Sequence, residues 1–293
     1  MRILQLYLLL FLIFSCAKKQ NEITPQLKVQ VTEPTKPKGK IQLLLGAVYK
    51  IDGVYQDFVM YPDTILKPEF QKYITDNGDS VILSEFNYFI HKLVLFKSDG
   101  DSIPLKDSVF IVKNNSIIRN DIFNLTSIPE GDYVKATFYL GTLKTPDQVA
   151  FLKSKAPEFF NTIDQYDFFQ FKGLYKNSDT ALAYPNEPTR YWKKFNWSLS
   201  SSDNVQDHSS QKMYCPFFTP IVVKNEGIAP YMHIRVNMRA SFGYADQNKS
   251  LIDIKAYSKE RFTSLNSILY TNIFSVDIKG ASRMFVNDHI HPN

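Results

Sequence analysis

The chain has 293 residues, of which 44% are hydrophobic and 22% are charged, and its 34 basic and 29 acidic side chains give a formal net charge of +5. Lysines cluster between residues 18 and 40 and are dispersed elsewhere, so the remainder is close to neutral. No basic stripe with interleaved aromatic residues is present, which excludes nucleic acid as the expected partner. A chain of this length can bury the core of one large β domain.

The first twenty residues, MRILQLYLLLFLIFSCAKKQ, predict a bacterial lipoprotein signal. An apolar run from Ile3 to Phe14 has the length of a signal-peptide core and is shorter than the ~20 residues of a membrane span. A small residue, Ser15, precedes a lone Cys16, as in a lipobox. We expect residues 1–15 to be removed and Cys16 to be acylated; ordinary cleavage nearby is the alternative. The lipid would anchor the protein in the cell envelope, on the periplasmic or surface face of the outer membrane.

The anchor is followed by a predicted tether. Residues 17–40 contain three prolines and few apolar side chains, which indicates a flexible linker. We therefore expect a tether over residues 16–40 and a folded domain over residues 41–293. Lipidation of Cys16 leaves Cys215 without an intrachain partner, so stability must come from the core rather than from a disulfide.

The domain pattern is mostly β. Residues 41–49 (IQLLLGAVY) form an apolar run before a turn at Asp52-Gly53, and residues 81–96 (VILSEFNYFIHKLVLF) form a long candidate strand closed by SDGDS. Short strands follow at SVFIV, DIFNL and YVKATFYLG, with a turn at residues 129–132. These closely spaced strand–turn cycles indicate antiparallel pairing, because parallel strands need longer crossovers.

Two segments predict helices. Residues 146–160 (PDQVAFLKSKAPEFF) suit a short helix that ends before Pro157. Residues 258–274 (SKERFTSLNSILYTNIF) carry apolar side chains at three- and four-residue spacings, with Ser258 as the N-cap. The expected fold class is mainly β, an antiparallel β-sandwich with one or two accessory helices.

Enzyme motifs are absent from the sequence. It contains no G-x-S-x-G, H-E-x-x-H, P-loop or G-x-G-x-x-G pattern. Cys215 is a candidate nucleophile, but a strand cysteine with bulky neighbours is more typical of a buried, inert thiol. We therefore expect a protein that is not an enzyme.

The sequence contains pairs of side chains that could bind a metal ion. The chain ends in MFVNDHIHPN, and in an extended segment residues i and i+2 point the same way, so His289 and His291 can face one ion. Met213 and Cys215 can do the same. Imidazole with sulfur suits copper, and imidazole with carboxylate suits zinc.

Two imidazoles alone make a weak site, so a third donor is needed. His233 is the first candidate, because residues 228–242 alternate and place His233, Arg235 and Asn237 on one strand face. Asp288 can fix a histidine tautomer if the chain bends. The structural alternative is that His289 hydrogen-bonds at the edge of the core and that His291 is solvated.

Four ordered segments resemble one known family. They read FNYFIHKLVL (86–95), IPEGDYVKATFYLG (128–141), MHIRVNMRASF (232–242) and MFVNDHIHPN (284–293). The set is similar to the MbnP-like family of periplasmic or lipid-anchored copper proteins. The resemblance implies a β-sandwich, a role in copper handling, and a C-terminal ending that forms the last strand of the domain.

The resemblance also implies a divergent copper site. Copper-binding relatives carry a W-x-W or W-x-H segment with an oxidisable tryptophan, and a later F-H-L-G segment. FFQFKGLY places Phe169 and Phe171 at the first positions, and FNWSLS places Ser198 at the histidine position. The usual copper ligands are therefore expected to be replaced. Trp192 and Trp197 are alternative oxidisable indoles, with packing in the core and at the edge of the sandwich as their other interpretation.

The sequence does not assign a role to two further histidines. His208 follows Trp197 by eleven residues, and His91 is either a local replacement within the family pattern or a surface residue.

Two functions remain. The first is a lipid-anchored MbnP-like binding protein, active in copper or other metal handling or as a degenerate relative. The second is a structural or interaction module of the bacterial envelope that binds no metal, with an envelope protein as its partner.

Overall fold

The computed structural model describes residues 37–51, 54–57, 59–61, 72–105, 108–115, 117–141, 143, 145–162, 165–177, 191–201, 210–243, 271–274, 277, 279 and 281–287. All of them belong to one compact unit, Lys36–Asn293. The predicted leader, Cys16, His208 and most of the predicted helix at 258–274 lie outside these ranges. No helix within the described ranges is long and apolar enough to cross a bilayer.

The large sheet is built on β5 (Ser80–Lys97), which confirms the strand predicted over residues 81–96. Its main path runs β12 (Lys193–Ser200), β11 (Asp167–Lys176), β5, β10 (Gly131–Gly141) and β13 (Ser210–Val223). Four short strands extend it: β4 (Tyr73–Ile74), β6 (Ser102–Pro104), β7 (Val109–Asn115) and β8 (Arg119–Asn120). Every pairing in this sheet is antiparallel, as the closely spaced turns predicted.

Two smaller sheets continue into each other along the chain. One has the order β14 (Tyr231–His233), β1 (Lys38–Leu44), β9 (Ile122–Pro129). The other has the order β16 (Phe285–Val286), β15 (Arg235–Asn237), β2 (Ala47–Ile51), β3 (Val54–Asp57). Two residues join β2 to β3, as the Asp52-Gly53 turn predicted.

The apolar run at 41–49 and the alternating run at 228–242 are each broken between these sheets, which corrects their interpretation as single strands. β14 pairs with β1, and β15 with β2, in parallel. Across the break, two hydrogen bonds hold the two segments of the chain together. They run from Ile234 N to the Leu44 carbonyl (3.0 Å) and from Val236 N to the Gly46 carbonyl (2.9 Å). After β15 the chain forms a short helix, α4 (Arg239–Phe242).

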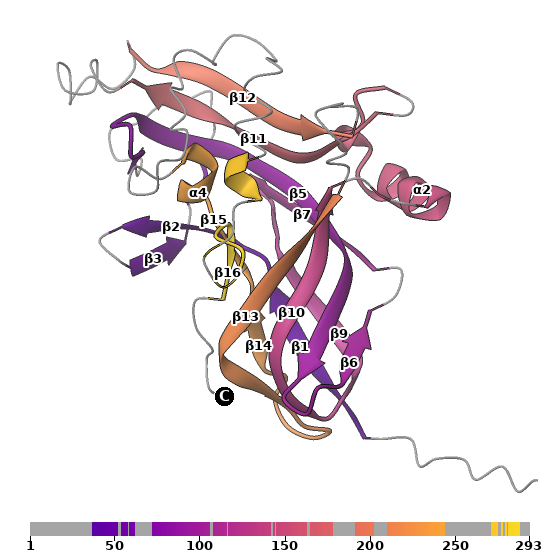
Figure 1. Ribbon diagram of the computed structural model, residues 1–293. Helices are drawn as coiled ribbons and strands as arrows, with labels where there is room; N and C mark the ends of the chain where they lie inside the picture. Colours follow the sequence, from indigo (N-terminus) through magenta and orange to yellow (C-terminus); the bar gives the residue numbers. More distant parts are fainter. Residues whose placement is uncertain are drawn as a thin grey trace, which may run out of the picture. The chain divides into compact units, whose positions relative to one another are not determined.

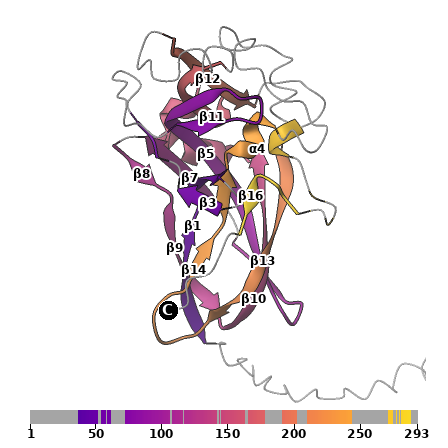
Figure 2. The ribbon, with the colours of Figure 1, turned by 90° about the vertical axis from the view of Figure 1, so that its left-hand side faces the viewer.

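The sheets form a β-sandwich, so the predicted fold class is confirmed. Figures 1 and 2 show β9, β1 and β14 in one layer and β10 and β13 in the other. The Phe285 ring from the C-terminal strand β16 packs against Phe138 (5.0 Å between centroids) and Tyr88 (5.9 Å) of the large sheet. The last described strand is therefore part of the core.

The accessory helix predicted at 146–160 is confirmed as α2 (Pro146–Lys155) followed by a 3-10 turn, η1 (Pro157–Phe159). Thr145 caps it by accepting a hydrogen bond from Gln148 N at 3.3 Å. The α-helix ends before Pro157, because proline disfavours the helical conformation in the residue that precedes it. Of the second predicted helix, the described residues 271–273 are helical.

Candidate metal centre

His233 is the described member of the predicted metal site, and it is buried at the end of β14. It pairs with Leu44 in the parallel register of β1. Its Nδ1 lies 3.2 Å from Nη2 of Arg235, and the Tyr231 ring meets the imidazole edge-on at 5.9 Å. The prediction that His233 and Arg235 share a face is confirmed by this contact.

The Arg235 contact determines which ring nitrogen of His233 carries the proton. A guanidinium group only donates hydrogen bonds, so Nδ1 accepts and the ring proton lies on Nε2. A metal ion bound at Nε2, with Arg235 still on Nδ1, would require an imidazolate. Coordination by a neutral imidazole therefore requires Arg235 to release Nδ1, and the buried guanidinium also repels a cation.

Asn287 fixes the C-terminal segment beside His233. Its Nδ2 donates to the His233 carbonyl at 3.0 Å, and its Oδ1 accepts from Phe218 N at 3.4 Å. Its backbone N–H bonds to the sulfur of Cys215. The asparagine is buried, and its contact with the His233 carbonyl is shielded from water. Sequence reasoning missed this residue, because only its spacing before the D-H-I-H ending sets it apart from other asparagines.

The remaining predicted donors, Asp288, His289 and His291, lie outside the described residues. The expected closing strand is confirmed as far as β16, whose residues pair antiparallel with β15. Asp288 therefore follows directly on a residue that contacts His233.

Cys215 is buried and faces the core with Met213, as their i, i+2 spacing predicted. Burial raises the pKa of the thiol to about 12, although the hydrogen bond from Asn287 opposes the shift. Such a thiol stays protonated at neutral pH, which makes it a poor nucleophile and a poor soft ligand. The interpretation of Cys215 as a buried, inert thiol fits this environment.

Two of the three positions that the resemblance assigned to a copper site belong to an aromatic cluster. Phe169 and Phe171 are fully buried, and the Phe171 ring contacts Trp197 (5.3 Å between centroids) and Phe242 (5.9 Å). Nε1 of Trp197 is buried with no hydrogen-bond partner among the described residues. The packed rings of this cluster are buried and offer no donor atom for copper, and Trp197 is a core residue as its packing interpretation predicted.

Ser198 cannot join the positions of Phe169 and Phe171. It pairs with Gln170 in the β11–β12 register, and directly paired residues project from the same face of a sheet. Gln170 alternates with the two phenylalanines, so Ser198 lies on the opposite face. A histidine at position 198 would therefore also point away from the aromatic cluster.

His91 and Trp192, two other candidate residues from the sequence, each lie against another side chain. His91 is fully buried in β5 against the Tyr139 ring at 5.7 Å, so its interpretation as a surface residue is wrong. Trp192 is half-buried beneath the Lys176 ammonium group, which lies 5.6 Å from the ring centroid. Across the described ranges, no group of three or more histidine, cysteine or acidic side chains is arranged to hold a metal.

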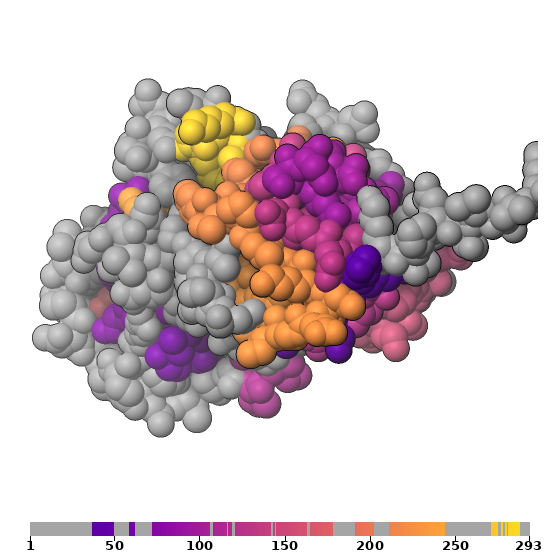
Figure 3. All heavy atoms as spheres, turned by 90° about the horizontal axis from the view of Figure 1, so that it is seen from below, coloured from indigo at the N-terminus to yellow at the C-terminus, as the bar shows by residue number. Residues whose placement is uncertain are grey.

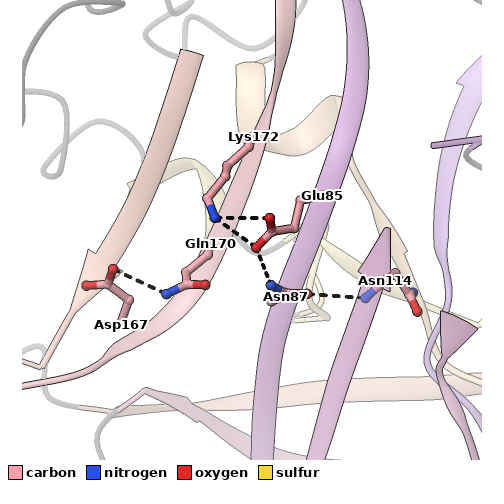
Figure 4. A network of polar contacts seen from close by, with 6 residues as sticks. All are labelled: Glu85, Asn87, Asn114, Asp167, Gln170 and Lys172. Atoms are coloured by element: carbon pink, nitrogen blue, oxygen red, sulfur yellow. Dashed lines mark hydrogen bonds and ion pairs between the residues drawn. The ribbon is translucent and has the colours of Figure 1, made fainter. Parts of the chain in front are cut away.

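A polar network occupies the face of the large sheet that carries Gln170. Figure 4 shows Glu85 between Lys172 and Asn87. Lys172 Nζ lies 2.9 and 3.0 Å from the two carboxylate oxygens, and Asn87 donates to one of them at 2.6 Å. Asn87 also accepts from Asn114 N of β7 at 3.2 Å. The network stabilises the register of β7, β5 and β11, and its polar residues were visible in the sequence as interruptions of aromatic strands.

Comparison with known proteins identifies the family. The MbnP family model matches residues 58–261. The chain belongs to the MbnP family. Among solved structures it is similar to MbnP from Methylosinus trichosporium, with 9% identity and a TM-score of 0.36 over 73% of this chain and 78% of that chain. No curated protein matches it.

Membership of the MbnP family agrees with the β-sandwich and relates the protein to copper handling. Within this family member, the aromatic cluster and the surroundings of His233 are two separate candidate regions. The first has no donors among its packed rings, and the second has a histidine beside a fixed C-terminal segment.

Proposed function

We propose that this MbnP-family protein is a lipid-anchored envelope protein that takes part in copper handling and binds the metal at its C-terminal end. His289 and His291 are the primary ligands, His233 is the third, and Asp288 orients one imidazole. Cys16 carries the lipid. The protein has a binding role rather than a catalytic one.

The position of Asn287 is the observation that carries the proposal. Its side chain lies on the His233 carbonyl, and His289 is two residues further along the chain. Two residues span at most about 7 Å, which limits the distance between the Cα atoms of Asn287 and His289. His291 shares a face with His289 in an extended segment. Imidazole ligands suit copper, with zinc as the metal most similar in ligand preference.

Arg235 sets the order of the ligands in this proposal. Because it occupies Nδ1 of His233, that histidine binds copper only after the guanidinium moves. His289 and His291 therefore contribute more to affinity than His233 does. Removing the pair should abolish binding, whereas removing His233 should weaken it.

Isothermal titration of the purified, tag-free protein with Cu(I), Cu(II) and Zn(II) tests the metal site. We expect copper affinity tighter than micromolar, lost in His289→Ala/His291→Ala and retained in His208→Ala, a histidine outside the proposed site. Affinity weaker than micromolar for all three metals, or a double variant that binds like the wild type, would refute the site.

The anchor is tested separately by labelling cells with an alkyne fatty acid. We expect label on the wild-type chain and none on Cys16→Ala, which should move to the soluble fraction. A Cys16→Ala chain that remains in the membrane would contradict lipidation at this residue.

A second function is favoured by the aromatic cluster. Phe169 and Phe171, which stand at two positions that the resemblance assigned to the copper site, pack against each other, and Phe171 packs against Trp197. The alternative is a degenerate family member that serves as an interaction module for an envelope protein. Wild-type protein that binds none of the three metals would favour it.

A further inference from the structure

The outer face of the large sheet carries lysines beside half-buried aromatic rings. Three rows follow the register of β5, β10 and β13: Phe96, Lys135 and Pro216; Val94, Thr137 and Tyr214; His91, Tyr139 and Lys212. Directly paired residues project from the same face of a sheet. The alternate residues of β10, Ala136 and Phe138, are buried in the core, so the rows face outward. We call these rows, together with Lys92 of β5, the lysine face. Seen from below, the surface of β13 (orange) adjoins that of the strands around β5 and β10 (magenta) (Figure 3).

Aromatic rings position two of the ammonium groups. Lys135 Nζ lies 4.7 Å from the centroid of Phe96 and 5.5 Å from that of Tyr214. Lys92 Nζ lies 5.7 Å from the centroid of Tyr139. Cation–π attraction therefore orders both ammonium groups above the sheet before any ligand arrives.

Lys92 lies at a bulge in β5. The register with β10 shifts between Thr137 and Tyr139, and Lys92 has a φ of 53°, in the left-handed region. This conformation is unfavourable for a residue with a side chain, and such strain is concentrated at functional sites. The bulge leaves Lys92 exposed between two buried neighbours, His91 and Leu93. Its ammonium group thereby belongs to the lysine face rather than to the core.

The lysine face carries uncompensated positive charge. Within the described part of the chain, none of Lys92, Lys135 and Lys212 forms an ion pair with a carboxylate. Lys92 and Lys212 belong to the strands on either side of β10, whose backbones are about 10 Å apart, and Lys135 lies roughly 13 Å from Tyr139 along β10. The face is therefore complementary to an extended partner with spaced negative charges.

Three observations decide the class of this partner. The backbone of β10 is paired on both sides, so a peptide cannot add to it as a strand. The exposed large apolar side chains of β13, Phe218 and Val222, lie outside the three rows, so the face has no apolar anchor for a membrane. Thr137, at the centre of the face, is buried, and its hydroxyl has no hydrogen-bond partner among the described residues. A ligand with hydroxyl groups between its anions supplies that partner.

We infer that the lysine face binds an acidic polysaccharide. Carboxylates of the polymer meet the ammonium groups of Lys92, Lys135 and Lys212, and a sugar hydroxyl bonds to Thr137. The half-buried Tyr139 and Tyr214 rings give the sugar rings a flat surface to pack on. Because the ammonium groups are near the surface, salt screens the attraction, and affinity falls as the salt concentration rises. No residue of the proposed metal site takes part.

Titration of the purified protein with an alginate oligosaccharide, a polymer of uronic acids, tests the inference. We expect binding that weakens with added NaCl, and none to an uncharged maltodextrin of equal length. Lys135→Gln should weaken binding about 10-fold, because it removes a charge-assisted contact. The matched control is Lys40→Gln, on an exposed lysine of β1, which should bind like the wild type. Alginate that does not bind, or that binds Lys135→Gln as tightly as the wild type, would overturn the inference.

A second variant separates a polysaccharide from other polyanions. Thr137→Val keeps the shape of the side chain and removes its hydroxyl, so alginate should bind about 5-fold more weakly. An oligoglutamate peptide, which has the charge without the hydroxyls, should bind more weakly than alginate and be indifferent to this change. Oligoglutamate that binds as tightly as alginate would overturn the polysaccharide. Unchanged thermal unfolding and copper affinity in both variants would show that the fold and the metal site are intact.

Discussion

The aromatic cluster and the surroundings of His233 are both buried, but they differ in what a metal ion would find there. Phe169, Phe171 and Trp197 present rings to one another, and the indole N–H is buried without a partner among the described residues. His233 contacts a cation and the fixed amide of Asn287. The first region stabilises the fold by packing, whereas the second has polar groups that a ligand can rearrange. Phe169 and Phe171, at positions that the resemblance assigned to copper binding, are therefore core residues in this chain, whereas His233 is a donor beside the segment that leads to the C terminus.

The largest expected effect is on stability, from Phe171→Ala. Truncating a fully buried phenylalanine costs about 3–5 kcal/mol, which lowers the melting temperature by roughly 10 °C. Copper affinity should not change, because this ring is not part of the proposed site. Phe151→Ala, on an exposed side chain of α2, is the control and should be nearly neutral. Loss of copper binding in folded Phe171→Ala would show that the aromatic cluster supports the metal site.

Asn287→Ala should have an intermediate effect and act on both properties. It removes hydrogen bonds to His233 and Phe218 in a buried site, which we expect to cost about 2 kcal/mol. It should also weaken copper binding by about 10-fold, because the C-terminal ligands lose their fixed starting point. Titration and thermal unfolding measure the two effects. The control is Asn124→Ala, on an exposed asparagine of β9, which should change neither the stability nor the copper affinity. If Asn124→Ala lowered both as much as Asn287→Ala does, Asn287 would have no special role.

The smallest effect expected near neutral pH concerns Cys215. Its pKa rises from 9.0 to about 12 in the folded protein. Because the raised pKa favours the protonated thiol in the fold, its contribution to stability is complete below pH 9 and is lost as the pH rises toward 12. Iodoacetamide should label Cys215 only after unfolding at neutral pH. The alkaline loss of unfolding free energy should be smaller in Cys215→Ala, and rapid labelling of the native protein would contradict the buried thiol.

The sequence predicted those features that depend on local pattern. The long apolar segment at 81–96 and the capped helix that stops before Pro157 are both determined by nearby residues. The break at residue 234 was not visible in the sequence, because it results from hydrogen bonds to a segment 190 residues earlier in the chain, from Ile234 to Leu44 and from Val236 to Gly46. Likewise, Ser198 lies on the sheet face opposite to Phe169 and Phe171 because of the β11–β12 register, which the sequence composition does not reveal.

In the candidate site, too, the sequence predicted what depends on local pattern and missed what depends on distant contacts. Alternation was enough to place Arg235 beside His233, but the consequence for Nδ1 needed the 3.2 Å contact. The role of Asn287 depends on three partners from two distant strands, so no local signal announces it. The exposure of Phe218 arises from a register shift in β13, in a segment whose sequence resembles a buried strand.

X-ray absorption spectroscopy of the copper-loaded protein shows whether imidazoles near the C terminus hold the metal. We expect three imidazole ligands in the wild type, two in His233→Ala, and none from the protein in His289→Ala/His291→Ala. An unchanged imidazole count in the double variant, or a copper shell without imidazole in the wild type, would contradict this expectation.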